Sequence, residues 1–244
     1  MTDEDWIARD RDQLVWRYMS FSRFVWLLQR KQLWLARADM LGDPWEIALA
    51  GDQLDHVIKR HPITPLPLTG ERWETAMERT ARIIPAWRQK TFVSCWNASD
   101  HESHALWRIY CGPVEGVAVQ STLGKLHDSS RAVPIYKVTY AMPGTQRRTP
   151  TLIDLVTRKR PMFAYEQEVR LVYVVEPNQA ETLAVREQHG RCLDWNPESH
   201  ADFIRVHPLA DSSFMETVVG AVEHYTPTLR GRVVWSAMRD PPPI

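Results

Sequence analysis

The chain has 244 residues, of which 44% are apolar and 25% are charged. This composition is typical of globular proteins and excludes a disordered, collagen-like or coiled-coil chain. Lys and Arg total 30 and Asp and Glu total 30, so the formal net charge is zero. A strongly basic nucleic-acid binder is therefore not indicated, although a local basic groove is still allowed.

The cysteines and the apolar runs bear on where the protein works. Cys95, Cys111 and Cys192 lie far apart without paired spacing, which argues against a disulfide scaffold and fits a reducing compartment. No segment has the roughly 18 apolar residues of a membrane helix, and the acidic start lacks the features of a secretory signal. We therefore expect a cytoplasmic protein with no membrane partner.

Strands and helices are predicted to mix along the whole chain. In chain order, the patterns predict a strand at 14–18, a helix at 21–28, a strand at 33–36, a helix starting at 43, a loop at 61–70, a helix at 73–89, a strand at 92–96, a helix at 103–110, strands at 117–119 and 133–140, a helix at 152–160, strands at 163–175 and 203–206, a helix at 214–222 and a strand at 233–235. Because the two kinds of element do not alternate regularly, the sequence predicts an α+β fold. We expect one domain, residues 1–244, with a split mixed or antiparallel sheet flanked by helices.

Two polar sites interrupt apolar strands. Arg17 lies inside the first strand, where a buried charge is costly without a partner, so it is either half of a structural salt bridge or an anion clamp. Ser121 and Thr122 close the strand at 117–119 just before Leu123. They are either a helix N-cap or part of a binding site.

A cluster of charges surrounds the strand predicted at 163–175. Its alternation places Glu166, Glu168 and Arg170 on one face. Two neighbouring carboxylates raise each other's pKa unless a cation lies between them. Because Lys159 and Arg160 precede this strand, the cluster is either a structural ion-pair network or a catalytic site.

The sequence contains no compact motif for a metal or a phosphate group. Cys95, His101, His104 and Cys111 do not have the spacing of a compact zinc site, and no Gly-rich phosphate loop is present. We therefore expect no bound metal.

The chain resembles a widespread bacterial family that is known only as a domain of unknown function. The resemblance covers nearly the whole chain and includes a D-P-x-E motif, at Asp43-Pro44-Trp45-Glu46, and an F-x-Y-E-x-E-x-R motif, from Phe163 to Arg170. Further matching segments lie at 14–18, 33–35, 92–96, 106–110, 116–119 and 159–160. Membership of this family implies no particular activity.

More distantly, the chain is similar to the ADP-ribosyltransferase superfamily. The shared order is an Arg on the first strand, Ser-Thr closing a middle strand and Glu-x-Glu opening a later strand, although Leu123 stands at the third position of the superfamily's Ser-Thr-Ser motif. The resemblance implies NAD as substrate, with Arg17 holding its phosphates or ribose. Ser121 and Thr122 would brace the nicotinamide pocket.

The same resemblance implies roles for the two glutamates and nearby aromatic residues. Glu168 would bind the nicotinamide ribose and stabilise its oxocarbenium-like transition state, and Glu166 would orient or deprotonate the acceptor. Tyr18, Trp16 or Tyr165 would stack on nicotinamide. The acceptor is a macromolecule or a small molecule that the sequence does not identify. The resemblance also implies that the enzyme could act as a toxin or defence effector.

Two other functions remain open from the residues. A metal-dependent nuclease would use Glu166, Glu168 and either Asp43 or Glu46 as metal ligands, with Lys159 near the scissile phosphate. A non-catalytic domain that binds a ligand or partner would need the charged clusters only for structure. The three hypotheses differ in which of these side chains meet in one cleft.

Overall fold

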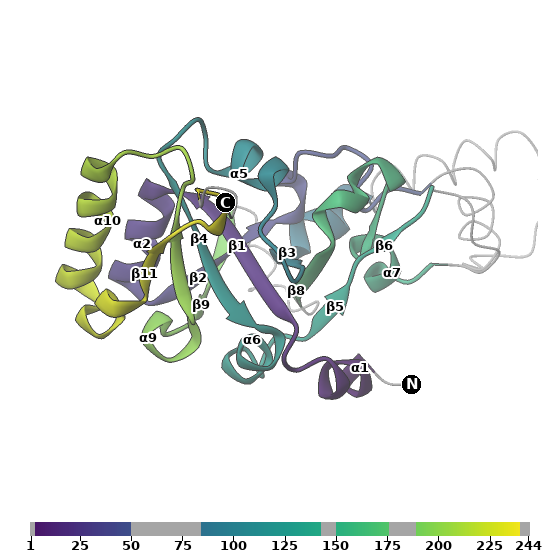
Figure 1. Ribbon diagram of the computed structural model, residues 1–244. Helices are drawn as coiled ribbons and strands as arrows, with labels where there is room; N and C mark the ends of the chain where they lie inside the picture. Colours follow the sequence, from purple (N-terminus) through teal and green to yellow (C-terminus); the bar gives the residue numbers. More distant parts are fainter. Residues whose placement is uncertain (1–2, 50–83, 143–149, 176–188, 240–244) are drawn as a thin grey trace, which may run out of the picture.

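The computed structural model describes residues 3–49, 84–142, 150–175 and 189–239 (Figure 1). Its strands are β1 (Leu14–Ser20), β2 (Gln32–Arg37), β3 (Thr91–Ala98), β4 (Gly116–Thr122), β5 (Ile135–Lys137), β6 (Thr139–Tyr140), β7 (Arg158–Lys159), β8 (Glu168–Val174), β9 (Gly190–Asp194), β10 (Phe203–Val206) and β11 (Val233–Trp235). The α-helices are α1 (Asp3–Arg9), α2 (Phe21–Arg30), α5 (His104–Tyr110), α6 (Leu123–Ser129), α7 (Leu152–Val156), α9 (Pro197–His200) and α10 (Ser212–Tyr225), with a further helix at 84–90. Short 3-10 helices are η1 (Ala38–Met40), η2 (Pro161–Glu166), η3 (Pro227–Arg232) and η4 (Ala237–Arg239).

Within the described residues, nine strands form one mixed sheet. Its strand order is β11-β10-β4-β1-β3-β2-β9, and β8 pairs with β3 and with β5. The β10–β11 pair is parallel, and the other pairs of this sheet are antiparallel. The predicted α+β class with a mixed sheet is therefore confirmed, whereas the domain boundaries 1–244 stay a prediction.

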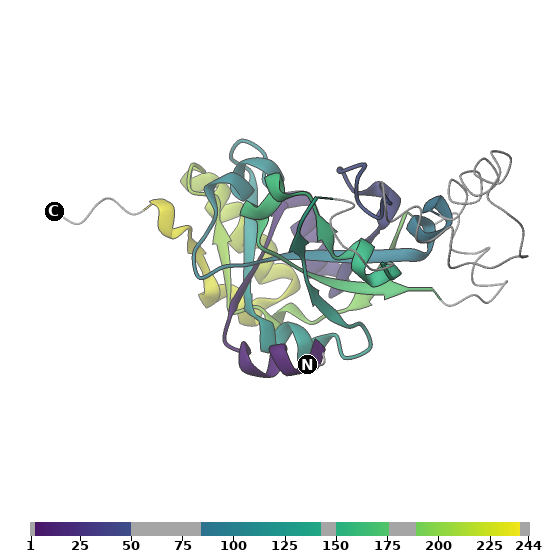
Figure 2. The same cartoon turned by 90° about the vertical axis from the view of Figure 1, so that its right-hand side faces the viewer.

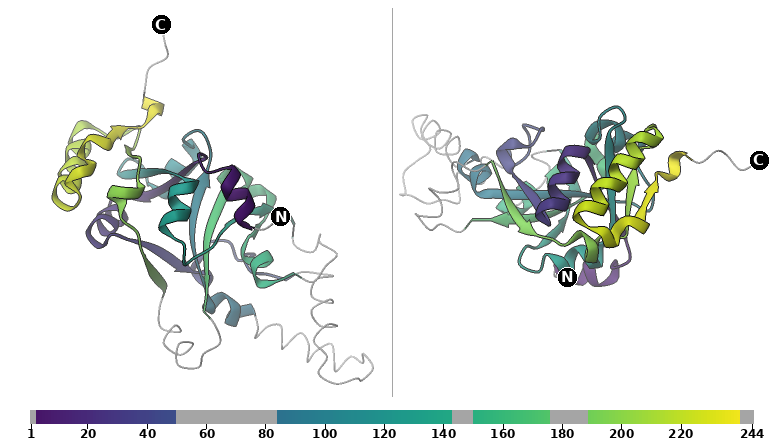
Figure 3. Two further views of the ribbon diagram at one scale, coloured as in Figure 1. Left: turned by 90° about the horizontal axis from the view of Figure 1, so that it is seen from below. Right: turned by 90° about the vertical axis from the view of Figure 1, so that its left-hand side faces the viewer.

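Helices cover both faces of the sheet. The largest apolar core lies between one face and helices α2, α6 and α10, through residues such as Phe24, Leu126 and Val222. Helix α10 packs against α2 at one end of the molecule (Figure 3), and α1 packs against α6 near the N-terminus (Figure 2). No helix in the described part of the chain is long and apolar enough to cross a membrane.

The opposite face carries two smaller cores rather than one. Over β1 and β4, Trp16 and Tyr18 pack with Leu106 and Trp107, of which the last two belong to α5. Over β3 and β8, the apolar side chains pack with α7 and with Ile47. The space between these two cores is the place where polar side chains gather.

Several local predictions were wrong, and each has a local backbone cause. The strand expected at 163–175 begins only at Glu168, because η2 precedes it and Gln167 adopts a left-handed conformation with φ 42°. The helix expected to start at Asp43 is a turn, in which the Asp43 carboxylate accepts the Trp45 N–H, and Ile47 is also left-handed at φ 51°. Left-handed residues interrupt a strand or a helix, because both need negative φ.

Other predicted elements are divided. The strand expected at 133–140 is two strands, β5 and β6, with different partners, and the helix expected at 152–160 ends at Val156 and continues as β7. Of the helix expected at 73–89, residues 84–90 are helical and the preceding ones lie outside the described residues, as does the loop expected at 61–70. Helix α1 and strand β9 have no counterpart among the predicted elements.

Candidate functional site

The sheet divides along one edge of β3. On its other edge, β3 pairs with β8 from Thr91 to Asn97. On the dividing edge, it meets β1 only at Asn97 and Ala98 and β2 only at Phe92 and Val93. Residues 94–96 are therefore not paired with β1 or with β2, and the sheet opens between these two strands.

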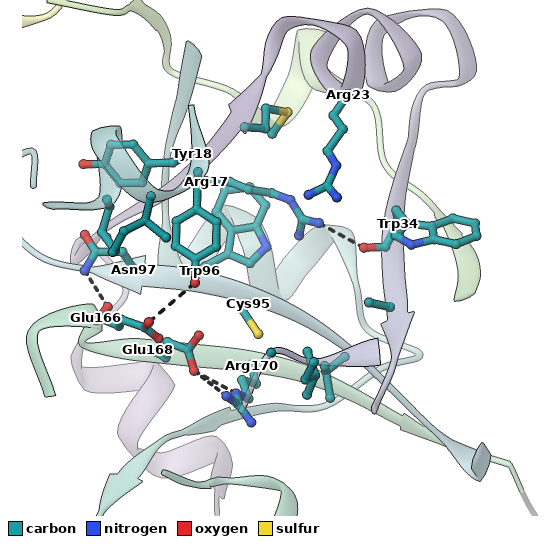
Figure 4. A pocket seen from close by; sticks show the side chains of 18 of the residues that line it. Arg17, Tyr18, Arg23, Trp34, Cys95, Trp96, Asn97, Glu166, Glu168 and Arg170 are labelled. Atoms are coloured by element: carbon teal, nitrogen blue, oxygen red, sulfur yellow. Dashed lines mark hydrogen bonds and ion pairs between the residues drawn. The ribbon is translucent and has the colours of Figure 1, made fainter. Parts of the chain in front are cut away.

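A cavity of about 1020 Å³ lies at this division (Figure 4). Its lining includes six of the residues predicted for an NAD site, namely Trp16, Arg17, Tyr18, Tyr165, Glu166 and Glu168. They come from β1, from η2 and from the first residue of β8, which are far apart in the sequence.

Arg17 spans the division of the sheet. Its guanidinium donates hydrogen bonds to the Ser94 hydroxyl and, at 2.9 Å, to the Trp34 main-chain oxygen, and its carbon Cζ lies 5.7 Å from the centre of the Trp96 ring. Burial lowers the pKa of Arg17 to about 10, and the nearby charge of Arg23 acts in the same direction. Arg17 therefore stays cationic at neutral pH, without a carboxylate partner among the described residues.

Glu168 is held by Arg170, which is 0% exposed. The Nε and Nη2 atoms of Arg170 donate to Glu168 Oε2 at 2.9 and 2.6 Å, and its Nη1 donates to Glu46 Oε2 and to the Val156 main-chain oxygen, both at 2.6 Å. Two N–H groups of the buried guanidinium converge on one oxygen of Glu168, and these charge-assisted hydrogen bonds hold the carboxylate in place.

Lys159 completes the charged cluster. Its ammonium binds Glu166 directly and lies 3.6 Å from Glu46 Oε1 and 3.7 Å from Glu168 Oε1. Burial alone would lower the pKa of Lys159, but the three carboxylates more than offset it and raise the pKa. Two cations and three carboxylates leave the cluster with one excess negative charge.

The two glutamates titrate differently because their neighbours differ. Burial raises the pKa of Glu166, and the adjacent charge of Glu168 raises it further, in spite of Lys159. Burial also acts to raise the pKa of Glu168, but Arg170 and Lys159 outweigh it and lower that pKa. Glu168 is consequently a fixed anion in the cavity wall, and Glu166 is the stronger base of the two.

Ser121 and Thr122 do not join this site. They end β4, as predicted, but β1 and β3 lie between β4 and β8 in the sheet, and neither residue is part of the cavity lining. The Ser121 hydroxyl donates to the His200 main-chain oxygen at 2.6 Å, and the Thr122 hydroxyl caps α6 by accepting the Lys125 N–H. The structure thus shows local hydrogen bonding for both hydroxyl groups.

The three predicted aromatic residues occupy different parts of the lining. Trp16 is buried, and its indole N–H donates to the Ser99 main-chain oxygen at 2.7 Å. Tyr18 is buried edge-on against Trp107, with ring centres 5.1 Å apart, and its hydroxyl accepts the Ser103 N–H. Tyr165 is exposed at the cavity rim. Of these aromatic residues, only Tyr165 is exposed to solvent.

Sequence reasoning missed several residues of the lining. Glu46 was interpreted only as part of a helix start or as a metal ligand, yet it contacts Arg170 and Lys159. Tyr110, at the end of α5, lies with its hydroxyl 3.5 Å from Glu166 Oε1. Asn97 lies in the buried strand β3, and this is the signal that would have singled it out, since Asn is depleted in strands.

The carboxylates do not form an open metal site. Glu46 and Glu168 do converge, but Arg170 and Lys159 lie between them, and Asp43 pairs with Arg160 at 2.9 Å. Among the described residues, no group of three or more His, Cys, Asp or Glu side chains is placed to hold a metal ion. This arrangement does not favour the nuclease hypothesis, which needs carboxylates free to meet a divalent cation.

No protein-family model and no curated protein sequence matches the chain. Among solved structures, the chain is similar to DarT of Thermus sp. 2.9 in complex with ADP-ribosylated ssDNA, with 14% sequence identity and a TM-score of 0.45. The similarity covers 93% of this chain and 96% of that chain. Because identity and TM-score are both low, we base the proposed function on the geometry of the cavity.

Proposed function

We propose that this protein is an ADP-ribosyltransferase-like enzyme that uses NAD as its substrate. The observation that carries the proposal is that Arg17 and Glu168 line one cavity from opposite sides of the divided sheet. A cation without a carboxylate partner among the described residues and a fixed carboxylate in one cavity suit a ligand with a negative diphosphate and a sugar that becomes positive during reaction.

The size and charge of the cavity support NAD as the ligand. Its volume of about 1020 Å³ is at the upper end of the roughly 300–1,000 Å³ usual for cofactor and drug-sized sites. Arg17 and Arg23 both line it, and Arg23 extends toward Arg17 (Figure 4). Two neighbouring cations repel each other, so an anion such as a diphosphate between them would be stabilising.

The first turn of α2 adds to this anion site. Ser22 and Arg23, from that turn, line the cavity, and the turn contains no acidic residue. The Ser20 side chain makes no capping hydrogen bond to it. The Phe21 N–H donates to the Glu115 main-chain oxygen. The start of a helix nevertheless favours negative charge, so the diphosphate is expected to lie between α2 and Arg17.

Glu168 supplies the electrostatic part of the chemistry. When the bond between the ribose and nicotinamide breaks, its electron pair leaves with the nicotinamide nitrogen and the sugar gains positive charge. Arg170 and Lys159 keep Glu168 ionised and oriented, so its carboxylate stabilises that charge without having to reorganise. A placed carboxylate has the same role in glycoside hydrolysis.

Glu166 is assigned to the acceptor. The acceptor atom bonds to the ribose carbon that nicotinamide has left and must lose a proton in the same process. A carboxylate with a raised pKa is a better base than an ordinary one, and Glu166 lines the cavity beside Glu168. Tyr165 at the rim is suited to contact the acceptor, whose identity the site leaves open.

The test is the substitution Glu168→Gln, which keeps the shape and removes the charge. NAD cleavage is expected to fall by roughly two to three orders of magnitude, as when one transition-state contact is removed. The free energy of unfolding should also fall by about 1–3 kcal/mol, because Arg170 loses an ionised partner. Turnover of labelled NAD with a cell extract is measured below the melting temperature, on protein with a native circular dichroism spectrum.

A matched control is Glu198→Gln. This is the same chemical change at an exposed ion pair with Lys31, and Glu198 is not part of the cavity lining. We expect turnover equal to that of the unsubstituted protein. If folded Glu168→Gln cleaved NAD within threefold of the unsubstituted protein, Glu168 would have no catalytic role.

A further inference from the structure

Trp34 places an indole in the wall of the cavity, on the other side of Arg17 from Glu168. Strand β2, which carries Trp34, pairs with the first part of β3, whereas Glu168 lies opposite Asn97 in its last part. In Figure 4, the Arg17 guanidinium lies between the Glu168 carboxylate and the Trp34 indole, and it donates to the Trp34 main-chain oxygen at 2.9 Å. The cavity lining therefore extends to both sides of this cation.

The indole is partly exposed and is held by close packing. Trp34 is 40% exposed and lines the cavity, although its neighbours in β2, Leu33 and Leu35, are buried. Its Cζ2 atom lies only 2.1 Å from the place where a Cβ on Gly190 would be, and Trp26 packs against it at an interplanar angle of 85°, with ring centres 6.0 Å apart. The ring thus loses little freedom when a ligand contacts it, and such preorganisation favours binding.

The surroundings of Trp34 are largely apolar. Helix α2 packs against β2 and contributes Trp26 and Leu27 to the lining. The nearest polar side chain on the same face of β2, Gln32, donates its amide N–H to Asp194 at 2.9 Å. A wall of this kind suits a flat ring system, because nucleobases stack on aromatic side chains through their π-faces.

The order of groups in NAD assigns its adenine to this wall. In the proposed function, the nicotinamide ribose lies at Glu168 and the diphosphate at Arg17 and Arg23, so the adenosine half continues past Arg17. We propose that Trp34 stacks on the adenine ring and makes the enzyme select the dinucleotide over nicotinamide mononucleotide. This inference rests on the proposed use of NAD.

The other exposed aromatic residues of the lining lie on the side of the glutamates. The Tyr110 hydroxyl is 3.5 Å from Glu166 Oε1, and Tyr165 directly precedes Glu166 in η2. Because Glu166 is assigned to the acceptor, these two rings belong to the acceptor side of the cavity. Among the described residues, Trp34 is then the exposed aromatic side chain of the lining that is left for the adenine.

Stacking on adenine acts far from the bond that breaks. Such a contact has the same strength in the ground state and in the transition state, so it lowers KM and leaves kcat unchanged. Nicotinamide mononucleotide has the same scissile bond and no adenine, so it gains nothing from Trp34. ADP-ribose, which keeps the adenine and the diphosphate, should bind with the help of Trp34 even without nicotinamide.

The test compares NAD and nicotinamide mononucleotide as substrates of Trp34→Ala. We expect kcat/KM for NAD to fall by roughly 10- to 100-fold, as for one lost base–aromatic stack, and to do so mainly through KM. For the mononucleotide, kcat/KM should change by no more than about twofold. Trp34→Phe, which keeps a smaller ring, should recover part of the loss with NAD.

A matched control and a second measurement complete the experiment. Trp45→Ala removes an indole that is 44% exposed and is not part of the cavity lining, and it should leave both substrates unaffected. Calorimetry with ADP-ribose measures binding without turnover. Its Kd should rise in Trp34→Ala by the same factor as the KM for NAD, and it should be unchanged in Trp45→Ala.

The outcomes distinguish this proposal from the proposed function. If Trp34→Ala keeps its affinity for NAD and ADP-ribose, or lowers the cleavage of both substrates equally by disturbing Arg17, stacking on Trp34 is overturned and the proposed function stands. If ADP-ribose binding depends on Trp34 but NAD is not cleaved, the adenine site stands and the proposed function fails. If neither NAD nor ADP-ribose binds, both proposals fail together.

Discussion

Glu166 and Glu168 have the same side chain two positions apart, yet their surroundings move their pKa values in opposite directions. Glu168 accepts two hydrogen bonds from the buried Arg170 guanidinium, whereas Glu166 forms an ion pair with Lys159 and is repelled by Glu168. Pairs of titratable groups with divergent pKa values are typical of acid–base sites. Structural ion-pair networks also shift pKa values, so substitution has to separate the two cases.

The raised pKa of Glu166 predicts a pH-dependent effect on stability. A carboxyl group whose pKa is higher in the folded state stabilises the fold below its ordinary pKa, and this contribution is lost as the pH rises through the raised value. Glu166→Gln removes that loss. The free energy of unfolding of the variant, minus that of the unsubstituted protein, should therefore be larger at pH 8 than at pH 4. The increase is about 1.4 kcal/mol per pH unit of difference between the folded and unfolded pKa.

Urea unfolding at the two pH values measures this difference. The exposed Glu115→Gln serves as the matched control, because it makes the same change away from the cluster. Glu168, with its lowered pKa, contributes in the opposite sense: its stabilisation is present above its ordinary pKa and is lost as the pH falls through the folded value. If the stability of Glu166→Gln relative to the unsubstituted protein decreased from pH 4 to pH 8, the pKa of Glu166 would be lowered, and the attraction of Lys159 would outweigh burial and repulsion from Glu168.

At the scale of elements, strand β9 shapes the cavity rim through Gly190. This residue pairs with Ala36 of β2, and a Cβ added to it would lie 2.1 Å from Trp34 Cζ2 and 2.7 Å from the Leu35 main-chain oxygen. Trp34 lines the cavity, and its main-chain oxygen accepts a hydrogen bond from Arg17. The absence of a side chain at Gly190 therefore leaves room for the Trp34 ring beside the site.

Gly190→Ala is expected to lower the free energy of unfolding by about 1–3 kcal/mol, as for other overpacking substitutions, and to displace the Trp34 ring. Chemical denaturation and tryptophan fluorescence measure the two effects. Gly220→Ala in helix α10 is the control, because an added Cβ meets nothing within 4 Å there and alanine favours a helix by about 1 kcal/mol. Equal stability of the two variants would mean that Trp34 moves aside without cost.

At the scale of the whole molecule, the sheet is joined only partly across its middle. The group β11-β10-β4-β1 meets the group containing β3, β2, β9, β8 and β5 through the two residue pairs between β1 and β3. Beyond them, Arg17 of β1 reaches Ser94 of β3 and the Trp34 main chain of β2. Arg17 thus both links the two halves of the sheet and presents a cation to the cavity between them.

Arg17→Lys is expected to lose part of each role. An ammonium group lacks the planar fork that reaches two acceptors and a phosphate together, so NAD affinity should fall about tenfold, as when one charge-assisted hydrogen bond is lost. Amide hydrogen exchange at residues 94–96 should become faster. Calorimetry and exchange measure the two effects, with exposed Arg9→Lys as control. Unchanged NAD binding would remove Arg17 from the proposed site.

Local sequence patterns determined most of the elements and part of the site. Short apolar runs identified strands such as β1, β3 and β4, because a strand that is buried on both faces is apolar at most of its positions. Arg17 and the pair Glu166 and Glu168 stood out as charges in apolar surroundings, and all three line the cavity. The breaks at Gln167 and Asp43 were not foreseen, since a left-handed residue or a side-chain turn leaves no periodic signal.

Tertiary structure decided which of these residues meet. Ser121 and Thr122 end the predicted strand, but two strands separate them from Glu168. Glu46 reaches Arg170 from 124 positions away in the sequence, and Asn97 meets Glu168 only through strand pairing. Sequence alone indicates which side chains are charged and which face of an element they occupy. Their partners, and hence their pKa values and chemistry, depend on how distant segments pack, because electrostatic and hydrogen-bond energies depend on distance in space.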